Sequence, residues 1–306
     1  MNLRDLGYLV ALADTRHFGR AAASCGVSQP TLSSQIRRLE ADLGAPLVRR
    51  DGGVDLTALG QRVVESARTM LALADDIRDM ARAQKGYGGD PVRVGIFPTL
   101  APFLIGHLFS GAKARHPGLR LAVVEEKTAG LLTALSQRRI DVALLASRVP
   151  APFVGVPVFR EEFVLATPAG SALSRGGPVE PSSLAGVDLL LMSEGHCLRD
   201  QTLDLCSTTG ASCRVDMSAA SIGTLRELVA AGSGPALLPR LAVSGPIPDD
   251  PRVVLREFTE PRPHRDVQLV ARPAVLERVE VQNVLDVCRH LPTDLVSPCI
   301  AQSPSA

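Results

Sequence analysis

The spacing of apolar residues changes along the 306-residue chain and divides it into five segments. Residues 1–58 show short stretches of helical spacing between tight turns, and residues 59–85 show one long helical stretch. The cluster Gly-Tyr-Gly-Gly-Asp-Pro at 86–91 would end any helix and predicts a hinge. Residues 92–291 alternate short β-type runs with helical stretches, and the tail 292–306, which contains Ser and Pro, is expected to be disordered.

Two short helices are predicted near the N-terminus. The first runs from Phe18 to a turn at Cys25-Gly26, where Gly26 suits the left-handed conformation that ends a helix. Ser28 can cap the second helix, and Pro30 lies in its first turn, where a missing N–H costs nothing. The buried stripe of this second helix is expected at Leu32, Ile36 and Leu39.

The opposite face of the second helix is polar and basic. It consists of Gln29, Pro30, Thr31, Ser33, Ser34, Arg37 and Arg38. Such a face suits the major groove of DNA, where an amide reads a base edge and where hydroxyl and guanidinium groups bind bases or phosphates. We therefore expect a DNA-binding helix-turn-helix, with a generic helical hairpin and a solvated basic face as the alternative.

The long stretch at 59–85 has apolar residues at steps of four and three. They are Leu59, Val63, Ala67, Met70, Ala74, Ile77 and Ala81. One helix cannot bury such a heptad-like seam alone, so a dimerising helix is expected, with packing onto its own domain as the alternative. Dimerisation also fits DNA binding, because a two-fold protein reads two half-sites. We expect a homodimer or homotetramer.

The β-type runs between 92 and 291 predict an α/β domain. They are Val92–Ile96, Arg120–Val124, Val142–Leu145, Phe163–Ala166, Leu189–Leu191, Pro235–Leu238, Val253–Leu255 and Val267–Val270. Their alternation with helix-length stretches indicates mostly parallel sheets. The length of the segment indicates two small lobes, with ligand chemistry at the carboxyl ends of strands.

The composition is that of an ordinary globular protein, with a hydrophobic fraction of 45% and a charged fraction of 21%. A net charge of +1 gives no global sign of nucleic-acid binding. The N-terminus lacks an export signal, and no apolar run approaches the ~18 residues of a membrane span. We expect a cytoplasmic protein without membrane contact, whose six cysteines form no static structural disulfides.

The stretch around Cys197 has the composition of a reactive thiol site. A cysteine reacts as its thiolate, and nearby cations or a helix N-terminus lower the pKa of the thiol. His196 and Arg199 flank Cys197, and Gly195 could mark the start of a helix. Asp200 could orient these neighbours or assist proton movement. Cys197 is thus the candidate to attack a peroxide, giving a sulfenic acid that a second thiol converts to a disulfide.

Cys206 is the natural second thiol, on one geometric condition. Nine residues of helix span about 13.5 Å, whereas a disulfide needs Cα atoms within about 7 Å. The stretch would have to refold before the bond closed, which would make it a bistable redox switch. Three alternatives stay open: a buried structural thiol at Cys197, resolution by Cys213, or a zinc site formed by His196, Cys197, Cys206 and Cys213.

Several N-terminal motifs resemble the DNA-binding signature of the LysR-type regulators. They are Ala21-Ala22, Val27–Ser33, Ile36–Glu40, Leu43-Gly44 and Pro46-Leu47. The resemblance covers nearly the whole chain and implies a winged helix-turn-helix, a linker helix and a two-lobed effector domain like that of periplasmic binding proteins. The segment 49–55 is slightly shorter than the usual wing and carries Gly and Asp where basic tips are common, which leaves Arg50 as the candidate phosphate contact.

The cysteine region resembles the hydrogen-peroxide-sensing members of that family. The matching residues are His196–Gln201, Cys206, Ser221, Thr224-Leu225, Val229–Gly234 and Leu237–Pro239. The resemblance implies that Cys197 is the peroxidatic cysteine and Cys206 the resolving cysteine, with no cofactor and no metal. It also implies control of oxidative-stress genes, with promoter DNA, hydrogen peroxide and RNA polymerase as candidate partners.

Three further residues are candidates for the peroxide site. Thr99 and Thr128 each follow a predicted strand where a helix starts, so hydroxyls and free backbone N–H groups can converge there on a small polar ligand. Plain helix capping is the alternative for both. The resemblance implies that such threonines hold peroxide beside the cysteine and that Arg265 supports the thiolate pocket.

Three other functions compete with this interpretation. A LysR-type regulator with a small organic effector between its lobes explains every feature except the paired cysteines with their His and Arg neighbours. The helix-turn-helix argues against a thiol peroxidase, for which turnover with a reductant would be the evidence. A solute-binding protein is disfavoured by the missing export signal and the additional N-terminal domain.

Overall fold

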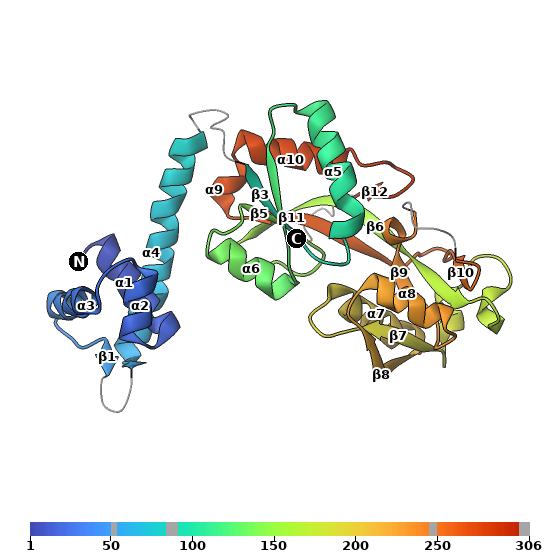
Figure 1. Cartoon of the computed structure of the whole chain (residues 1–306), viewed down its shortest axis with the longest axis horizontal. Helices are drawn as coiled ribbons and strands as arrows, with labels where there is room; N and C mark the ends of the chain where they lie inside the picture. Colours follow the sequence, from blue (N-terminus) through green and yellow to red (C-terminus); the bar gives the residue numbers. More distant parts are fainter. Residues whose placement is uncertain (50–53, 84–90, 245–249, 300–306) are drawn as a thin grey trace, which may run out of the picture. The chain divides into compact units, whose positions relative to one another are not determined.

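The computed structural model describes residues 1–49, 54–83, 91–244 and 250–299, and the chain divides into two units, Met1–Gln84 and Lys85–Ala306 (Figure 1). The predicted hinge at 86–91 lies outside the described residues except for Pro91. Within the described ranges, every helix is too short or too polar to cross a membrane.

The first unit begins with three helices, α1 (Leu3–Thr15), α2 (Phe18–Ser24) and α3 (Gln29–Leu43). The turn before α3 forms as predicted, with Gly26 at a φ of 65° and the Ser28 hydroxyl accepting a hydrogen bond from the Thr31 N–H. The predicted stripe of Leu32, Ile36 and Leu39 is fully buried. These side chains share one core with the apolar face of α1, which fixes the orientation of the polar face of α3.

A short hairpin and a long helix complete the first unit. β1 (Val48–Arg49) pairs antiparallel with β2 (Asp55–Leu56), and α4 spans Ala58–Ala83. Arg50, the predicted phosphate contact, lies outside the described residues.

The predicted apolar seam of α4 changes character along the helix. Ala67 is fully buried in the core of the first unit, and so is Val64 at 4% exposure. Further along, Met70 is 46% exposed and Ile77 is 66% exposed. The first half of α4 therefore packs onto its own unit, as the alternative interpretation held. The exposure of Met70 and Ile77 leaves dimerisation as a prediction, and the seam residue Ala81 lies outside the side chains that the structure describes.

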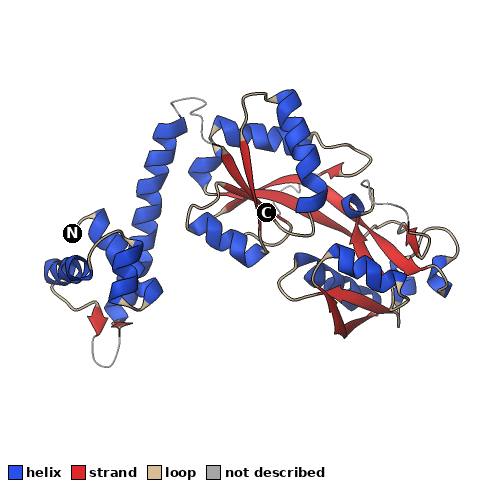
Figure 2. Cartoon of the chain, viewed as in Figure 1, coloured by secondary structure: helices blue, strands red, loops and turns tan. Residues whose placement is uncertain are grey.

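The second unit is built on one sheet with helices over it (Figure 2). The strands are β3 (Val92–Ile96), β4 (Leu121–Glu125), β5 (Val142–Leu145), β6 (Val154–Pro168), β7 (Asp188–Met192), β8 (Ser212–Ala219), β9 (Ala236–Pro239), β10 (Val253–Arg256), β11 (His264–Ala271) and β12 (Ser297–Pro298). The helices are α5 (Ala101–Arg115), α6 (Thr128–Ser136), α7 (Cys197–Thr209), α8 (Ile222–Ala230), α9 (Pro273–Leu276) and α10 (Val279–Arg289), with short 3-10 turns η1 (Ala172–Ser174), η2 (Pro181–Leu184) and η3 (Arg240–Ala242).

The strand order is β4-β3-β5-β11-β6-β9-β7-β8, with β10 and β12 also paired to β6. The sheet is parallel at its ends, where β3 pairs with β4 and β5, and β7 with β8 and β9. At its centre β6 and β11 pair antiparallel with each other and with their neighbours. The expectation of mostly parallel sheets is therefore wrong for the centre. The cause is the 15-residue strand β6, of which the apolar pattern predicts only Phe163–Ala166.

Two hydrophobic cores define the two predicted lobes. β6 runs through both, contributing Phe159 to the first core and Phe163 to the second. The C-terminal segment is ordered further than predicted, because Val296 is buried in the first core and β12 pairs with β6. Burial of apolar side chains thus overrides the Ser and Pro composition as far as residue 299, and residues 300–306 lie outside the described part.

Candidate functional site

The turn between β7 and α7 places Cys197 at the N-terminus of a helix. Gly195 has a φ of 83°, a left-handed conformation that other residues rarely adopt, and it redirects the chain after β7. His196 is the N-cap residue and Cys197 is the first residue of α7, as predicted. Cys197 is only 7% exposed and belongs to the core of the first lobe.

Arg265 on β11 is connected to Cys197 through Thr99. The Thr99 hydroxyl lies 3.9 Å from the Cys197 sulfur. Arg265 donates from Nη1 to that hydroxyl and from Nη2 to the Thr99 carbonyl, both at 3.0 Å. Leu100, and not Thr99, is the N-cap residue of α5, so the capping alternative does not hold for Thr99. The structure thus brings together three of the predicted site residues in a buried series of polar contacts.

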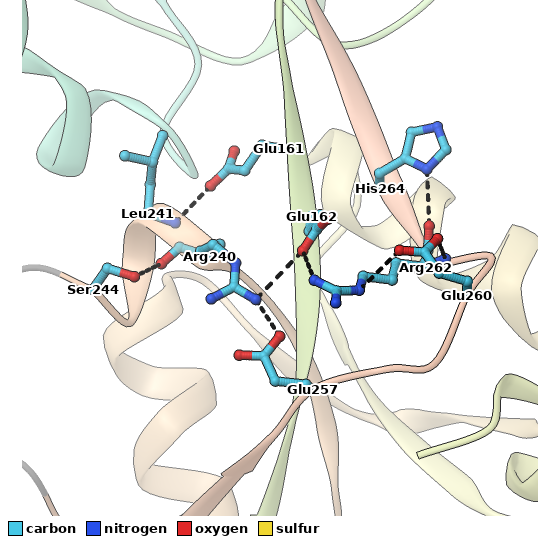
Figure 3. A network of polar contacts seen from close by, with 9 residues as sticks. All are labelled: Glu161, Glu162, Arg240, Leu241, Ser244, Glu257, Glu260, Arg262 and His264. Carbon is cyan, nitrogen blue, oxygen red and sulfur yellow. Dashed lines mark hydrogen bonds and ion pairs between the residues drawn. The ribbon is translucent and has the colours of Figure 1, made fainter. Parts of the chain in front are cut away.

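Arg265 also forms an ion pair with Glu161 on β6, a residue that the sequence analysis missed. Arg265 Nε donates to Glu161 Oε2 at 2.7 Å, and both side chains are 0% exposed. The second carboxylate oxygen accepts the Leu241 N–H at 2.9 Å, as Figure 3 shows. Glu161 lies between Phe159 and Phe163 on one face of β6, so an acidic residue within that alternation was the available signal.

The electrostatics of the thiol differ from the sequence prediction. Burial raises the pKa of Cys197, and the positive charge of Arg265 is the largest influence that lowers it. Burial and the nearby Lys127 lower the pKa of His196, which favours a neutral ring. Arg199 donates to the Met192 carbonyl at 3.0 Å. Neither His196 nor Arg199 is among the main influences on the Cys197 pKa, in contrast to the sequence prediction, and Arg265 supplies the main positive charge.

A small hollow lies in front of Cys197. Its lining is Phe97, Pro98, Thr99, Lys127, Thr128, Gly195, His196 and Cys197. Thr128 is the first residue of α6, whose N-cap is Lys127, so capping does not explain its position either. Arg199 and Asp200 do not line the hollow. In this conformation the hollow has no room for a water-sized molecule, so a ligand can enter only after side chains move.

Cys206 lies in the last turns of α7 and is joined by a disulfide to Cys213 of β8. Their Cα atoms are 6.7 Å apart. Cys206 belongs to the core of the second lobe, whereas Cys197 belongs to that of the first. The turn after α7 makes this bond possible by bringing β8 beside the helix, and the expectation that the cysteines form no static disulfides stays a prediction. Among the described residues, no three His, Cys, Asp or Glu side chains are grouped as a metal site would require.

The predicted DNA-binding face of α3 is accessible in the first unit. Gln29, Pro30, Thr31, Ser34, Arg37 and Arg38 are exposed, and Ser33 is partly exposed. Arg37 donates to the Ser33 hydroxyl at 3.3 Å, which holds its guanidinium along the helix surface. Hydroxyl, amide and guanidinium groups therefore share one solvent-facing surface, as DNA reading requires.

Two protein-family models match the chain. Residues 3–61 match "Bacterial regulatory helix-turn-helix protein, lysR family", and residues 86–292 match "LysR substrate binding domain". Together they account for the first unit as far as the start of α4 and for nearly all of the second unit.

Individual relatives are similar over almost the full length. The DNA-binding transcriptional dual regulator OxyR of Escherichia coli is 40% identical over 293 residues, which cover 94% of this chain and 95% of that protein. A full-length OxyR variant from Pseudomonas aeruginosa is 31% identical, with a TM-score of 0.74 and 99% of both chains covered. A hydrogen-peroxide-bound OxyR mutant from Corynebacterium glutamicum is 31% identical, with a TM-score of 0.63 over 94% of this chain and 91% of that one.

Proposed function

This chain belongs to the LysR-type transcription regulators, and on that premise we propose that it is a DNA-binding regulator that senses hydrogen peroxide through Cys197. The observation that carries the proposal is the buried series of polar contacts that links Cys197, Thr99 and Arg265 at the N-terminus of α7. The Corynebacterium glutamicum relative with hydrogen peroxide bound supports the choice of ligand.

The reaction at Cys197 is a displacement on the peroxide. The Cys197 thiolate attacks one oxygen, an S–O bond forms as the O–O bond breaks, and the leaving hydroxide takes up a proton to become water. Arg265 stabilises the thiolate and the developing hydroxide through its charge, and the hydroxyls of Thr99 and Thr128 orient the peroxide. Opening of the hollow precedes this step, because it has no room for peroxide in this conformation.

Cys206 then resolves the sulfenic acid. Its thiol condenses with Cys197, releasing water and leaving a Cys197–Cys206 disulfide. The two residues lie nine positions apart on α7 and in separate cores, so the helix has to unwind before the bond forms. Unwinding of α7 is the switch that alters the regulatory unit.

The output of the switch is a change in DNA binding. A homodimer or homotetramer, joined through α4, on which Met70 and Ile77 are exposed, transmits the unwinding to its helix-turn-helix units on the promoter. The regulated genes are those of the oxidative-stress response, with RNA polymerase as the partner at the promoter. The protein acts in the cytoplasm, and regulation rather than peroxide turnover is its function.

Footprinting on DNA fragments that the full chain selects from a genomic library tests this proposal. Reduced wild type and Cys197→Ser should protect the same fragments, and peroxide should change the footprint of the wild type alone. Cys299→Ser is the control and should respond like the wild type, because Cys299 does not line the hollow. A wild-type footprint that peroxide leaves unchanged, or an equal change in Cys197→Ser, contradicts the proposal.

A cleft in the regulatory unit favours a second candidate function, regulation by a small organic effector. The cleft has a volume of about 640 Å³ and is lined from both lobes, among others by Phe103, Glu125, Met192 and Arg226. Small-molecule sites usually occupy roughly 300–1,000 Å³. A footprint that responds to a metabolite extract in Cys197→Ser, and to peroxide in neither protein, would favour this function.

A further inference from the structure

Cys213 has no part in the proposed sensing reaction, yet it is the residue to which Cys206 is bonded. We infer that Cys213 is a second resolving cysteine, which takes Cys206 out of the Cys197–Cys206 disulfide and returns Cys197 to its thiol form. The inference rests on the proposed function and explains how the same site is switched off. Its end point is the pairing in this structure, with Cys197 free and Cys206 bonded to Cys213.

Cys206 can form a disulfide with Cys213 or with Cys197, and these two bonds require different conformations of α7. The bond to Cys213 forms with α7 helical from Cys197 to Thr209 and with the Cα atoms 6.7 Å apart. This separation is within the usual limit of about 6.8 Å. The bond to Cys197 has to bridge about 13.5 Å of helix. Only the Cys197–Cys206 bond therefore requires the helix to unwind.

The positions of the thiols in the two cores also favour the Cys206–Cys213 disulfide over the Cys197–Cys206 disulfide. Cys206 is 7% exposed in the second core, and Cys213 packs against that core. Cys197 is 7% exposed in the first core. A Cys197–Cys206 bond has to pull at least one sulfur out of its core, whereas the Cys206–Cys213 bond leaves both cores intact. Strain makes a disulfide a stronger oxidant, so exchange toward Cys213 is favourable.

The connection between α7 and β8 makes the second bond readily accessible. Gly210, at a φ of 74°, ends α7, and β8 begins at Ser212. The turn is short enough to set Cys213 beside the last turns of the helix. β8 lies at the end of the sheet order and Cys213 is partly exposed, so its side chain is accessible from solvent.

The exchange step is chemically balanced. The Cys213 thiolate attacks the Cys206 sulfur, a Cys206–Cys213 bond forms as the Cys197–Cys206 bond breaks, and Cys197 leaves as a thiolate. From peroxide onward, one hydrogen peroxide removes two electrons from the chain, two waters are released, and the lasting product is one Cys206–Cys213 disulfide. No further oxidant is needed. Because α7 can then refold, the response ends before any cellular reductant acts.

Time-resolved disulfide mapping of the reduced full chain, after one equivalent of hydrogen peroxide, tests the inference. In wild type the Cys197–Cys206 peptide should appear first and give way to Cys206–Cys213, while Cys197 becomes open to alkylation again. In Cys213→Ser the first disulfide should persist roughly tenfold longer or more. Cys213→Ala serves if the serine variant folds poorly by circular dichroism, and Cys299→Ser is the matched control, expected to follow the wild type.

The possible outcomes separate this inference from the proposed function. A Cys197–Cys206 bond that persists equally in wild type and Cys213→Ser would overturn the exchange and leave peroxide sensing intact. Formation of Cys206–Cys213 at the wild-type rate in Cys197→Ser would also overturn it, since peroxide would then oxidise that pair directly. Absence of any oxidation at Cys197 would overturn the proposed function, and the exchange with it.

Discussion

Two neighbouring cross-strand ion pairs, one buried and one partly exposed, allow a matched test of how the buried pair near Cys197 contributes to stability. On β6 and β11, Arg265 pairs with Glu161 and Asp266 pairs with Arg160. Successive strand residues face opposite sides of a sheet. The first pair is accordingly 0% exposed at both side chains, whereas Arg160 and Asp266 are 27% and 40% exposed. The informative change is Glu161→Gln, and its control is Asp266→Asn.

The structure gives the expected magnitudes. Glu161→Gln keeps the side-chain shape and an oxygen for the Leu241 N–H, but it leaves the Arg265 charge buried without its carboxylate. Removing one partner of a buried pair costs about 3–5 kcal/mol, and removing one of an exposed pair about 0–1 kcal/mol. At about 2–4 °C per kcal/mol for a unit of this size, the melting temperature should fall by about 6–20 °C in Glu161→Gln. In Asp266→Asn it should fall by at most about 4 °C.

Thermal unfolding followed by far-ultraviolet circular dichroism is the assay, because the chain contains no Trp for fluorescence. Glu161→Gln should also slow peroxide oxidation of Cys197 at a temperature where the variant is folded, because Arg265 loses its anchor. Equal losses of melting temperature in the two variants, or an unchanged value for Glu161→Gln, would refute the reasoning.

Three further predictions concern the thiol, the pH dependence and the DNA. Thr99→Val removes the hydroxyl beside Cys197. Because a hydrogen bond to a charged group contributes about 1.5–3 kcal/mol, we expect peroxide to oxidise Cys197 roughly 10- to 100-fold more slowly in this variant. Alkylation of the remaining thiol measures the rate. A hydrogen bond from Arg115 holds the pKa of Asp286 below its usual range, so this carboxylate stabilises the fold above its unfolded pKa and the contribution is lost as pH falls through the folded pKa. Melting curves should therefore depend less on pH below about pH 4 in Asp286→Asn than in wild type. Arg37→Ala should weaken binding to all selected DNA fragments alike and reduce the slope against salt concentration by about one, as titrations at several salt concentrations will report.

Local chemistry made the helix-turn-helix and the start of α7 predictable. A serine cap at Ser28, glycines at Gly26 and Gly195, and an apolar stripe act within a few residues, so their effects can be inferred without knowing the fold. For α4, the apolar seam was predictable but its packing partner was not. A periodic apolar pattern does not say whether Ala67 meets its own unit or a partner helix.

The remainder of the site depends on contacts between distant segments. His196 and Arg199 lie close to Cys197 in sequence, but the cation that most opposes the rise of its pKa on burial is Arg265, on a strand far along the chain. Glu161 was missed because its partner becomes visible only once β6 and β11 pair in register. The pairing of Cys206 with Cys213 likewise depends on the turn geometry after α7, which spacing alone left open.

The measurement that tests the account most directly is the rate at which hydrogen peroxide oxidises each cysteine of the reduced full chain. Cys288 is an internal reference, because burial raises its pKa to about 12 and should leave it unreactive while the protein is folded. The account predicts that limiting peroxide consumes Cys197 first, well before Cys288 and Cys299. Oxidation of Cys197 no faster than that of Cys288 or Cys299 would contradict it.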